Sequence, residues 1–169
     1  CSATTTIQIV QPASFTVAIN GTGPACAGAS TGTATATAIG GVGPYSYQWN
    51  NGMTGPTRNG LPAGTYSVTA TDANGCTASV SIVLSQPQAL VQVIQVLQQP
   101  CTGAATGALS VAASGGTAPY SFVWSNGVSG ANLQNIQAGA YTVTVADSRG
   151  CTATASQALT ALSSPTCIV

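Results

Sequence analysis

The sequence predicts an all-β fold of tandem antiparallel β-sandwiches, and three observations favour it. Thr, Val, Ile and Tyr, which are enriched in strands, recur in short alternating runs. Gly, Pro and Asn, which favour turns, separate these runs roughly every ten residues. Residues 101–159 also repeat residues 26–84 without a gap, and nearly half of the aligned residues are identical. Each copy is therefore expected to fold as one structural unit.

The strands of the first repeat are expected in a definite order. A lead-in run is rich in β-branched residues, a Thr/Ala run alternates with the period of a half-buried strand, and a third run places three aromatic rings on one face. The expected strands are Phe15–Asn20, Thr31–Ala38, Tyr45–Trp49, Thr57–Leu61, Tyr66–Thr71 and Cys76–Leu84. In the second repeat, the lead-in run Leu90–Val96 has a three-residue Gln rhythm, so a helix is the alternative there.

The 75-residue period also extends to both ends of the chain. Residues 1–12 align with residues 76–87, and Cys167 follows Cys151 at a shorter interval than Cys101 follows Cys76. We expect two full repeats of a longer array. The predicted segments are residues 1–11 as the last strand of a preceding repeat, 12–85 as the first sandwich, 86–160 as the second sandwich, and 161–169 as the start of a following segment.

Charge is almost absent from the sequence. The charged side chains are Arg58, Asp72, Asp147 and Arg149, and there is no Lys, Glu or His. Soluble domains average about 25% charged residues, whereas this chain has 2%. A basic surface for nucleic acid is excluded, and without a general base we expect no enzyme activity, no catalytic residue and no cofactor. No apolar run is long enough to span a bilayer, so no membrane insertion is expected.

The six cysteines predict disulfides rather than a metal site, because the chain has no CxxC pair and no His. Disulfides indicate an oxidising, extracellular compartment. Cys26 and Cys76 are separated by 50 residues, as are Cys101 and Cys151. We therefore expect the pairs Cys26–Cys76 and Cys101–Cys151, each closing one repeat and stabilising it by ~4 kcal/mol on the chain-entropy model. Cys1 and Cys167 remain candidates for inter-repeat or intermolecular bonds.

The aromatic residues are expected to be structural. Leu61–Tyr66 is similar to the tyrosine corner of immunoglobulin-like sandwiches, and Ile136–Tyr141 repeats it. Trp49 and Trp124 are expected to pack over the disulfide, as the core Trp of antibody domains does. The full set of expected core aromatics is Trp49, Trp124, Tyr66, Tyr141, Tyr45 and Tyr120. The alternative is a carbohydrate-binding platform of Tyr45, Tyr47 and Trp49, which needs exposed rings.

Two motifs together resemble the SprB-type repeat. The first run contains Gly-Gly, Pro-Tyr, Trp and Asn-Gly over residues 40–52, and the second joins Ala-Gly-x-Tyr-x-Val-Thr to Asp-x-x-Gly-Cys over residues 63–76. The second copy carries the equivalents 75 positions on. SprB-type repeats occur in very large surface adhesins of gliding Bacteroidota. The resemblance implies type IX export and display as cell-surface filaments that support adhesion and gliding, and it transfers no catalytic residues.

Three functional hypotheses follow from the sequence. The first is a stalk of tandem sandwiches, whose partners are neighbouring repeats. The second is a self-polymerising fibre subunit, in which residues 1–11 complete a sandwich in another copy by strand addition. The third is a carbohydrate-binding module for surface glycans. The near absence of charge also predicts stability that is almost indifferent to salt and to pH between about 5 and 9.

Overall fold

The computed structural model describes residues 1, 3–7 and 14–163, which form twelve strands. The first six are β1 (Thr16–Thr22), β2 (Gly32–Ile39), β3 (Ser46–Trp49), β4 (Thr57–Leu61), β5 (Gly64–Thr71) and β6 (Thr77–Leu84). The second six are β7 (Val91–Gln98), β8 (Gly107–Ser114), β9 (Ser121–Trp124), β10 (Asn132–Ile136), β11 (Gly139–Ala146) and β12 (Thr152–Leu159). Each of β7–β12 begins 75 residues after its counterpart in β1–β6, so the sequence repeat is also a structural repeat.

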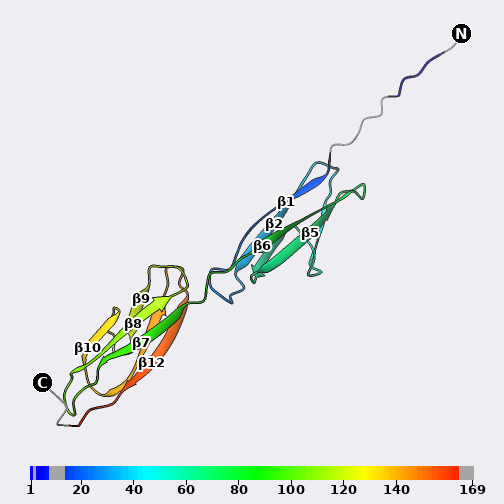
Figure 1. The fold of residues 1–169 in the computed structure, drawn as a ribbon. Helices are drawn as coiled ribbons and strands as arrows, with labels where there is room; N and C mark the ends of the chain where they lie inside the picture. The colour runs from blue at the N-terminus through cyan, green and yellow to red at the C-terminus, as the bar shows by residue number, and fades with distance from the viewer. Residues whose placement is uncertain (2, 8–13, 164–169) are drawn as a thin grey trace. The chain divides into compact units, whose positions relative to one another are not determined.

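Each set of six strands forms two antiparallel three-stranded sheets (Figure 1). The first set has the strand orders β1-β2-β4 and β3-β5-β6, and the second has β10-β8-β7 and β12-β11-β9. The strand register repeats as well, because Gly64 pairs with Leu84 in the β5–β6 hairpin and Gly139 pairs with Leu159 in the β11–β12 hairpin. The all-β prediction is confirmed, and the helix alternative for Leu90–Val96 is wrong because this segment is strand β7.

The chain divides into two compact units. Unit 1 comprises Cys1–Pro24 and Ser30–Ser85, and unit 2 comprises Ala25–Ala29 and Gln86–Val169. Ala25–Ala29, which we call the cysteine loop, therefore lies within the first repeat of the sequence but packs as part of the second unit. The expected strand at residues 1–11 stays a prediction, because Cys1 and residues 3–7 carry no strand and residues 8–11 lie outside the described part of the chain.

Alternating burial along the strands builds a separate core in each unit. In β5, Tyr66, Val68 and Ala70 are buried while the residues between them are less so, which is the pattern of a strand with one face on a core. The core of unit 1 contains Ala34, Ala36, Trp49, Leu61, Tyr66, Val68 and Leu84. The core of unit 2 contains Leu109, Val111, Trp124, Leu133, Ile136, Val143, Val145 and Leu159.

One pair of facing core positions differs between the units. In unit 2, Leu109 pairs with Leu133 across β8 and β10, and both side chains are buried. The equivalent pair in unit 1 is Ala34 and Arg58. The guanidinium of Arg58 donates to the sulfur of Met53, but its Nε is buried with no hydrogen-bond partner. The small side chain of Ala34 thus faces the long side chain of Arg58, and the Arg58 Nε–H is left as an unsatisfied hydrogen-bond donor, which is destabilising.

We expect unit 1 to become more stable when this pair is made like that of unit 2. The double variant Ala34→Leu/Arg58→Leu removes the unsatisfied donor and restores apolar packing, which should stabilise unit 1 by about 1–3 kcal/mol. Denaturant unfolding of the oxidised chain measures the gain. Arg149→Leu removes the same charge from an exposed turn residue of unit 2 and should leave the stability of unit 1 unchanged. A double variant that is no more stable than the parent would show that Arg58 does not destabilise unit 1.

No helix in the described residues is long and apolar enough to cross a membrane.

Candidate functional site

In the first repeat, the chain reaches Cys26 from the end of the sandwich where β6 finishes, whereas Cys76 lies at the end where β6 begins. Gly23, three residues before Cys26, packs against the backbone of Ser85 at the end where β6 finishes. Cys76 directly precedes β6 at its other end, beside the Thr71–Thr77 pair of the β5–β6 hairpin. An eight-residue strand spans about 25 Å, whereas a disulfide requires Cα atoms about 4.4–6.8 Å apart. The predicted pair Cys26–Cys76 is therefore wrong.

The structure instead joins Cys26 to Cys151, with an S–S distance of 2.03 Å, Cα atoms 5.6 Å apart and a sequence separation of 125 residues. The predicted pair Cys101–Cys151 is also wrong, because Cys151 is bonded to Cys26 instead. Cys101 is disulfide-bonded as well. Among the described residues, Cys1 and Cys76 are free and exposed. Cys167, the other candidate for a bond between repeats, lies outside the described residues.

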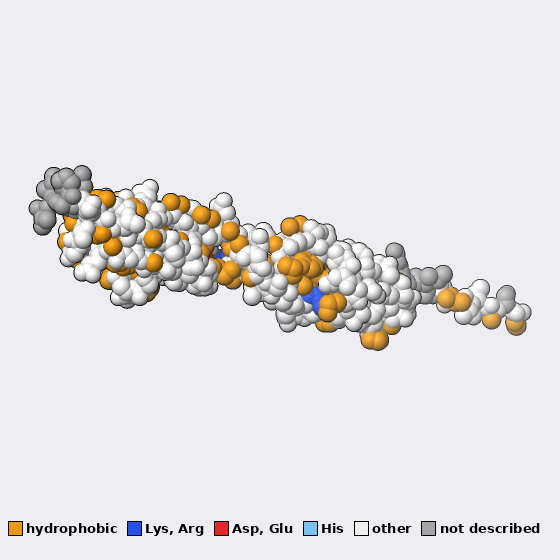
Figure 2. Space-filling view, turned by 90° about the horizontal axis from the view of Figure 1, so that it is seen from below, with side chains coloured by type: hydrophobic (Ala, Val, Ile, Leu, Met, Phe, Trp, Pro, Cys, Tyr) orange, Lys and Arg blue, Asp and Glu red, His pale blue; other side chains and the backbone are white. Residues whose placement is uncertain are grey.

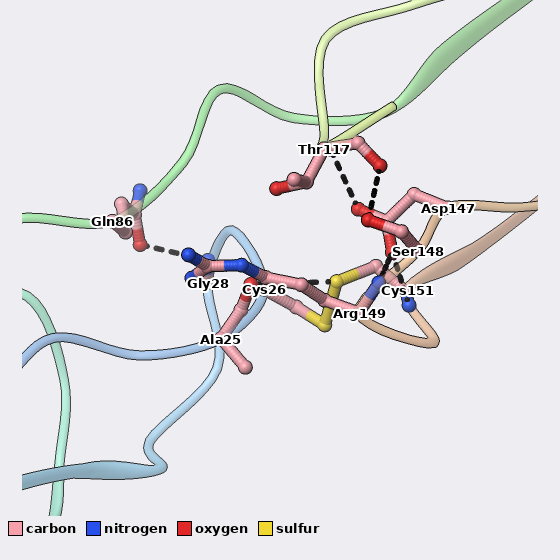
Figure 3. Close-up of a disulfide and its surroundings, with 9 residues drawn as sticks. All are labelled: Ala25, Cys26, Gly28, Gln86, Thr117, Asp147, Ser148, Arg149 and Cys151. Atoms are coloured by element: carbon pink, nitrogen blue, oxygen red, sulfur yellow. Dashed lines mark hydrogen bonds between the residues drawn. A yellow bond between two sulfur atoms is a disulfide. The ribbon is translucent and has the colours of Figure 1, made fainter. Parts of the chain in front are cut away.

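The cysteine loop of unit 2 forms a compact turn (Figure 3). The backbone N–H of Ala29 donates to the carbonyl of Cys26 at 3.2 Å, and Gly28 has φ +73°, a conformation that L side chains rarely adopt. The N–H of Gly28 donates to Oε1 of Gln86 at 2.8 Å. The disulfide is thus held by a turn of defined shape and by a side-chain contact on the chain that enters unit 2.

The other half of the site is the hairpin of residues 147–151, which we call the Asp hairpin of unit 2. Asp147 is 6% exposed. Its Oδ1 accepts the N–H groups of Arg149 and Cys151, both at 2.9 Å, and its Oδ2 accepts the N–H of Thr117 at 2.9 Å. One carboxylate therefore fixes both the turn and the loop beside it, and it positions the backbone of Cys151 for the disulfide (Figure 3).

The Asp hairpin of unit 1, residues 72–76, has the same construction. Oδ1 of Asp72 accepts the N–H groups of Asn74 at 2.9 Å and Cys76 at 2.8 Å, and Oδ2 accepts the N–H of Val42 at 3.0 Å. The N–H of Asp72 donates to the carbonyl of Cys76 at 2.9 Å, as that of Asp147 does to Cys151. Both aspartates are therefore the first residues of their hairpins and hold them by the same set of hydrogen bonds.

Hydrogen bonding lowers the pKa of both carboxyls. The N–H of Val42 has the largest effect and lowers the pKa of Asp72 below its ordinary 3.8; burial opposes it, and the N–H groups of Cys76 and Asn74 add to it. Burial is the largest influence on the pKa of Asp147 and raises it. The N–H groups of Cys151, Thr117 and Arg149, with the charge of Arg149, outweigh burial, so the net shift is again downward.

These shifts predict that pH affects stability only on the acid side. A carboxyl whose pKa is lower in the folded state stabilises the fold while it is ionised, and this stabilisation is lost as the pH falls below 3.8 through the lowered value. We expect a constant unfolding midpoint between about pH 5 and 9, unchanged by salt, and a decline below pH 3.8. Thermal scans of the oxidised chain measure it. A midpoint that rises on acidification would contradict the role of Asp72 and Asp147.

The predicted core aromatics fall into three groups. Trp49 and Trp124 are 2% and 1% exposed, and their indole N–H groups donate to Gly55 at 2.8 Å and Gly130 at 2.9 Å. No disulfide lies beneath them in the described residues, so that part of the prediction is wrong. Since Trp49 is buried, the three-ring sugar platform is also wrong.

Tyr66 and Tyr141 form tyrosine corners. The Tyr66 hydroxyl donates to the carbonyl of Pro62 at 2.9 Å, and that of Tyr141 to Gln137 at 3.0 Å. Each bond spans four residues back along the chain, as in immunoglobulin-like domains. These bonds fix the connection that carries the chain from one sheet to the other.

Tyr45 is exposed, so its predicted place in the core is wrong, whereas Tyr120 is partly buried and packs against the core of unit 2. Tyr45 is 39% exposed and stacks on Phe15 with ring centroids 5.9 Å apart. The hydroxyls of Tyr45 and Tyr120 donate to Gly40 at 2.9 Å and to Gly115 at 2.6 Å. Both rings therefore fasten the loop that follows the second strand of their unit, beside the Asp hairpin.

The comparisons with known proteins agree with this geometry. A family model of the SprB repeat matches residues 20–54 and residues 99–129. One matched region lies in each sequence repeat, so both repeats are similar to the SprB repeat over these residues. A repeat of this family with an immunoglobulin-like fold indicates an extracellular, adhesin-like repeat domain. No curated protein matches the chain.

Two solved structures are similar to this chain. The three N-terminal domains of the highly immunogenic outer capsid protein (Hoc) of bacteriophage RB49 are 19% identical, with a TM-score of 0.50, over 86% of this chain and 58% of that chain. A C-terminal 282-residue fragment of intimin, solved with the intimin-binding domain of its translocated receptor, is 18% identical, with a TM-score of 0.45, over 87% of this chain and 64% of that chain. This chain thus spans less than two thirds of either structure.

The sequence contained one indication against the predicted pair Cys26–Cys76. Cys26 lies in the connection between β1 and β2, whereas Cys76 lies in the turn between β5 and β6. Following each strand from end to end places the two cysteines apart. The partner itself could not be found in this way, because the position of the cysteine loop in unit 2 depends on folded packing.

Proposed function

We propose that these SprB-type repeats form a load-bearing, non-catalytic segment of a cell-surface adhesin, in which disulfides tie each repeat to the next. The observation that carries the proposal is the bond between Cys26 and Cys151. It starts in the sequence of the first repeat and ends in the second. A bond within one repeat would protect that repeat alone, whereas this bond also secures the connection between repeats.

The covalent topology supports a mechanical role. The disulfide closes a loop that contains strands β2 to β11, and only β1 and β12 with the chain ends lie outside it. Tension applied to the two ends passes from Cys26 to Cys151 through the sulfur atoms. The enclosed strands therefore cannot be drawn out into extended chain while the bond is intact.

The chemistry of the chain supports a passive role outside the cell. A disulfide persists in an oxidising compartment, and a closed loop of this length stabilises the folded state by about 5 kcal/mol on the chain-entropy model. The face in Figure 2 is dominated by uncharged side chains, with small areas of Arg. Two Arg and no Lys leave trypsin-like proteases few cleavage sites. Export by the type IX route, a filament and a role in gliding belong to this proposal, as the family resemblance implies.

Electron microscopy of a longer oxidised array tests the stalk. We expect tandem copies of residues 12–160 to appear as thin rods with a regular bead spacing, because each link is covalently fixed. The same array in reductant is the control and should show a wider spread of angles between beads. Oxidised arrays that appear as independently oriented globules would contradict the proposal.

A further inference from the structure

Cys76 occupies the same position in unit 1 as Cys151 does in unit 2. Both are the fifth residue of a hairpin that begins with a buried Asp, and both donate their backbone N–H to that carboxylate. The difference between them is covalent, because Cys151 is bonded to Cys26 whereas Cys76 is free and exposed. The same structural position is therefore seen once with a partner and once without.

The turn that contains Cys26, the partner of Cys151, occurs twice in the chain. In the cysteine loop, Ala29 donates to the carbonyl of Cys26 and Gly28 has φ +73°. Around Cys101, Ala104 donates to the carbonyl of Cys101 at 3.0 Å and Gly103 has φ +75°. Both loop cysteines are disulfide-bonded. A Cys-x-Gly turn thus presents a bonded cysteine twice in the chain, and for Cys26 the partner cysteine lies in an Asp hairpin.

We propose that Cys76 is the acceptor for the cysteine loop of another repeat, a segment with the sequence and turn of Ala25–Ala29. This inference rests on the proposed linkage of successive repeats and names the contact that continues it beyond unit 1. Formation of the bond from two thiols releases two protons and passes two electrons to a disulfide oxidant, which is reduced to a dithiol.

The acceptor is already shaped before any partner arrives. The N–H of Ala73 donates to the carbonyl of Val42 at 2.8 Å, and that of Ser148 donates to Thr117 at 2.9 Å, so the loop beside the hairpin is fixed equally in both units. Asp72 makes its three backbone hydrogen bonds although Cys76 has no partner. Binding therefore requires little ordering of unit 1, which favours capture of a matching loop.

A peptide with the sequence of residues 23–31, supplied as its mixed disulfide with glutathione, tests the inference on the intact chain. The Cys76 thiolate attacks the peptide sulfur, the peptide–glutathione bond breaks, and glutathione leaves as a thiolate that takes up the proton lost by Cys76. Millimolar peptide approximates the effective concentration of a tethered loop. Mass spectrometry after an acid quench measures which cysteine carries the peptide.

We expect the amount of peptide on Cys76 to be about tenfold or more the amount on Cys1, because even a modest binding free energy gives a tenfold preference. Cys1 is also free and exposed but lacks an Asp hairpin, so it reports simple thiol access. A peptide with Gly28→Val cannot readily adopt the positive φ of the turn and should lose the preference. The Cys76→Ser chain should carry peptide on Cys1 alone.

Two results would overturn the inference. One is equal capture by Cys76 and Cys1, and the other is equal capture of the parent and Gly28→Val peptides by Cys76. Either would show that Cys76 is an ordinary exposed thiol. Neither result affects the bond between Cys26 and Cys151, which can be verified in the same spectra, so failure of this inference and failure of the proposed function are distinguishable.

Discussion

We expect the oxidised chain, pulled from its two ends, to extend to about 160 Å, instead of the roughly 590 Å of a fully extended chain of this length. The reason is the bond between Cys26 and Cys151, which leaves only residues 1–26 and 151–169 outside the closed loop. Single-molecule force spectroscopy measures the difference directly. It is the largest effect that the structure predicts, because about three quarters of the chain is withheld from extension by one bond.

Reduction and substitution provide the controls. In excess reductant, the extension should reach the full contour length. Cys151→Ser should extend well beyond 160 Å by the same estimate, because the load then passes through the enclosed strands. Cys76→Ser removes a free thiol and should behave like the parent chain. An oxidised parent that extends to the full contour length would contradict the load-bearing role.

The second large effect concerns the Trp at the centre of each core. Trp49→Ala should destabilise unit 1 by about 3–5 kcal/mol, the usual cost of removing a buried Trp. Its neighbours in the core include Ala34 and Ala36, which are too small to fill the cavity. A domain has a net stability of about 5–15 kcal/mol. The variant should therefore bring unit 1 close to unfolding while unit 2, with its own core, remains folded.

Two probes separate the units in this experiment. In the Trp49→Ala chain, the fluorescence of Trp124 reports unit 2 alone, whereas circular dichroism reports the strands of both. We expect an early transition by circular dichroism that fluorescence does not show. Trp49→Phe retains most of the apolar volume and loses only the bond to Gly55, so it should cost much less. A single shared transition in Trp49→Ala would contradict two separately packed cores.

The strands and turns could be predicted from the sequence because local patterns determine them. The period-two alternation of β2 and β5, the hairpin turns and the tyrosine corner all follow from residues close together in the chain. The all-β fold and the buried positions of Trp49 and Trp124 were accessible for this reason. Most core positions of one repeat also predict those of the other, and Leu133 against Arg58 is one exception.

The disulfide could not be predicted because a repeat makes its spacing ambiguous. Cys26 is 50 residues from Cys76 and one further 75-residue period from Cys151, so both pairs satisfy the periodicity. The choice depends on which ends of the sandwiches hold the two cysteines and on the packing of Ala25–Ala29 with unit 2. Both are properties of the folded chain. Spacing within a repeat is therefore insufficient evidence for a bond within that repeat.

Disulfide mapping of the oxidised protein tests the central claim most directly. With thiols blocked and the chain denatured, trypsin should cut after Arg58 and Arg149 and release residues 1–58, 59–149 and 150–169. We predict that residues 1–58 are joined to residues 150–169, with fragmentation placing the bond between Cys26 and Cys151. A bond between Cys26 and Cys76, or between Cys101 and Cys151, would contradict a covalent link between successive repeats.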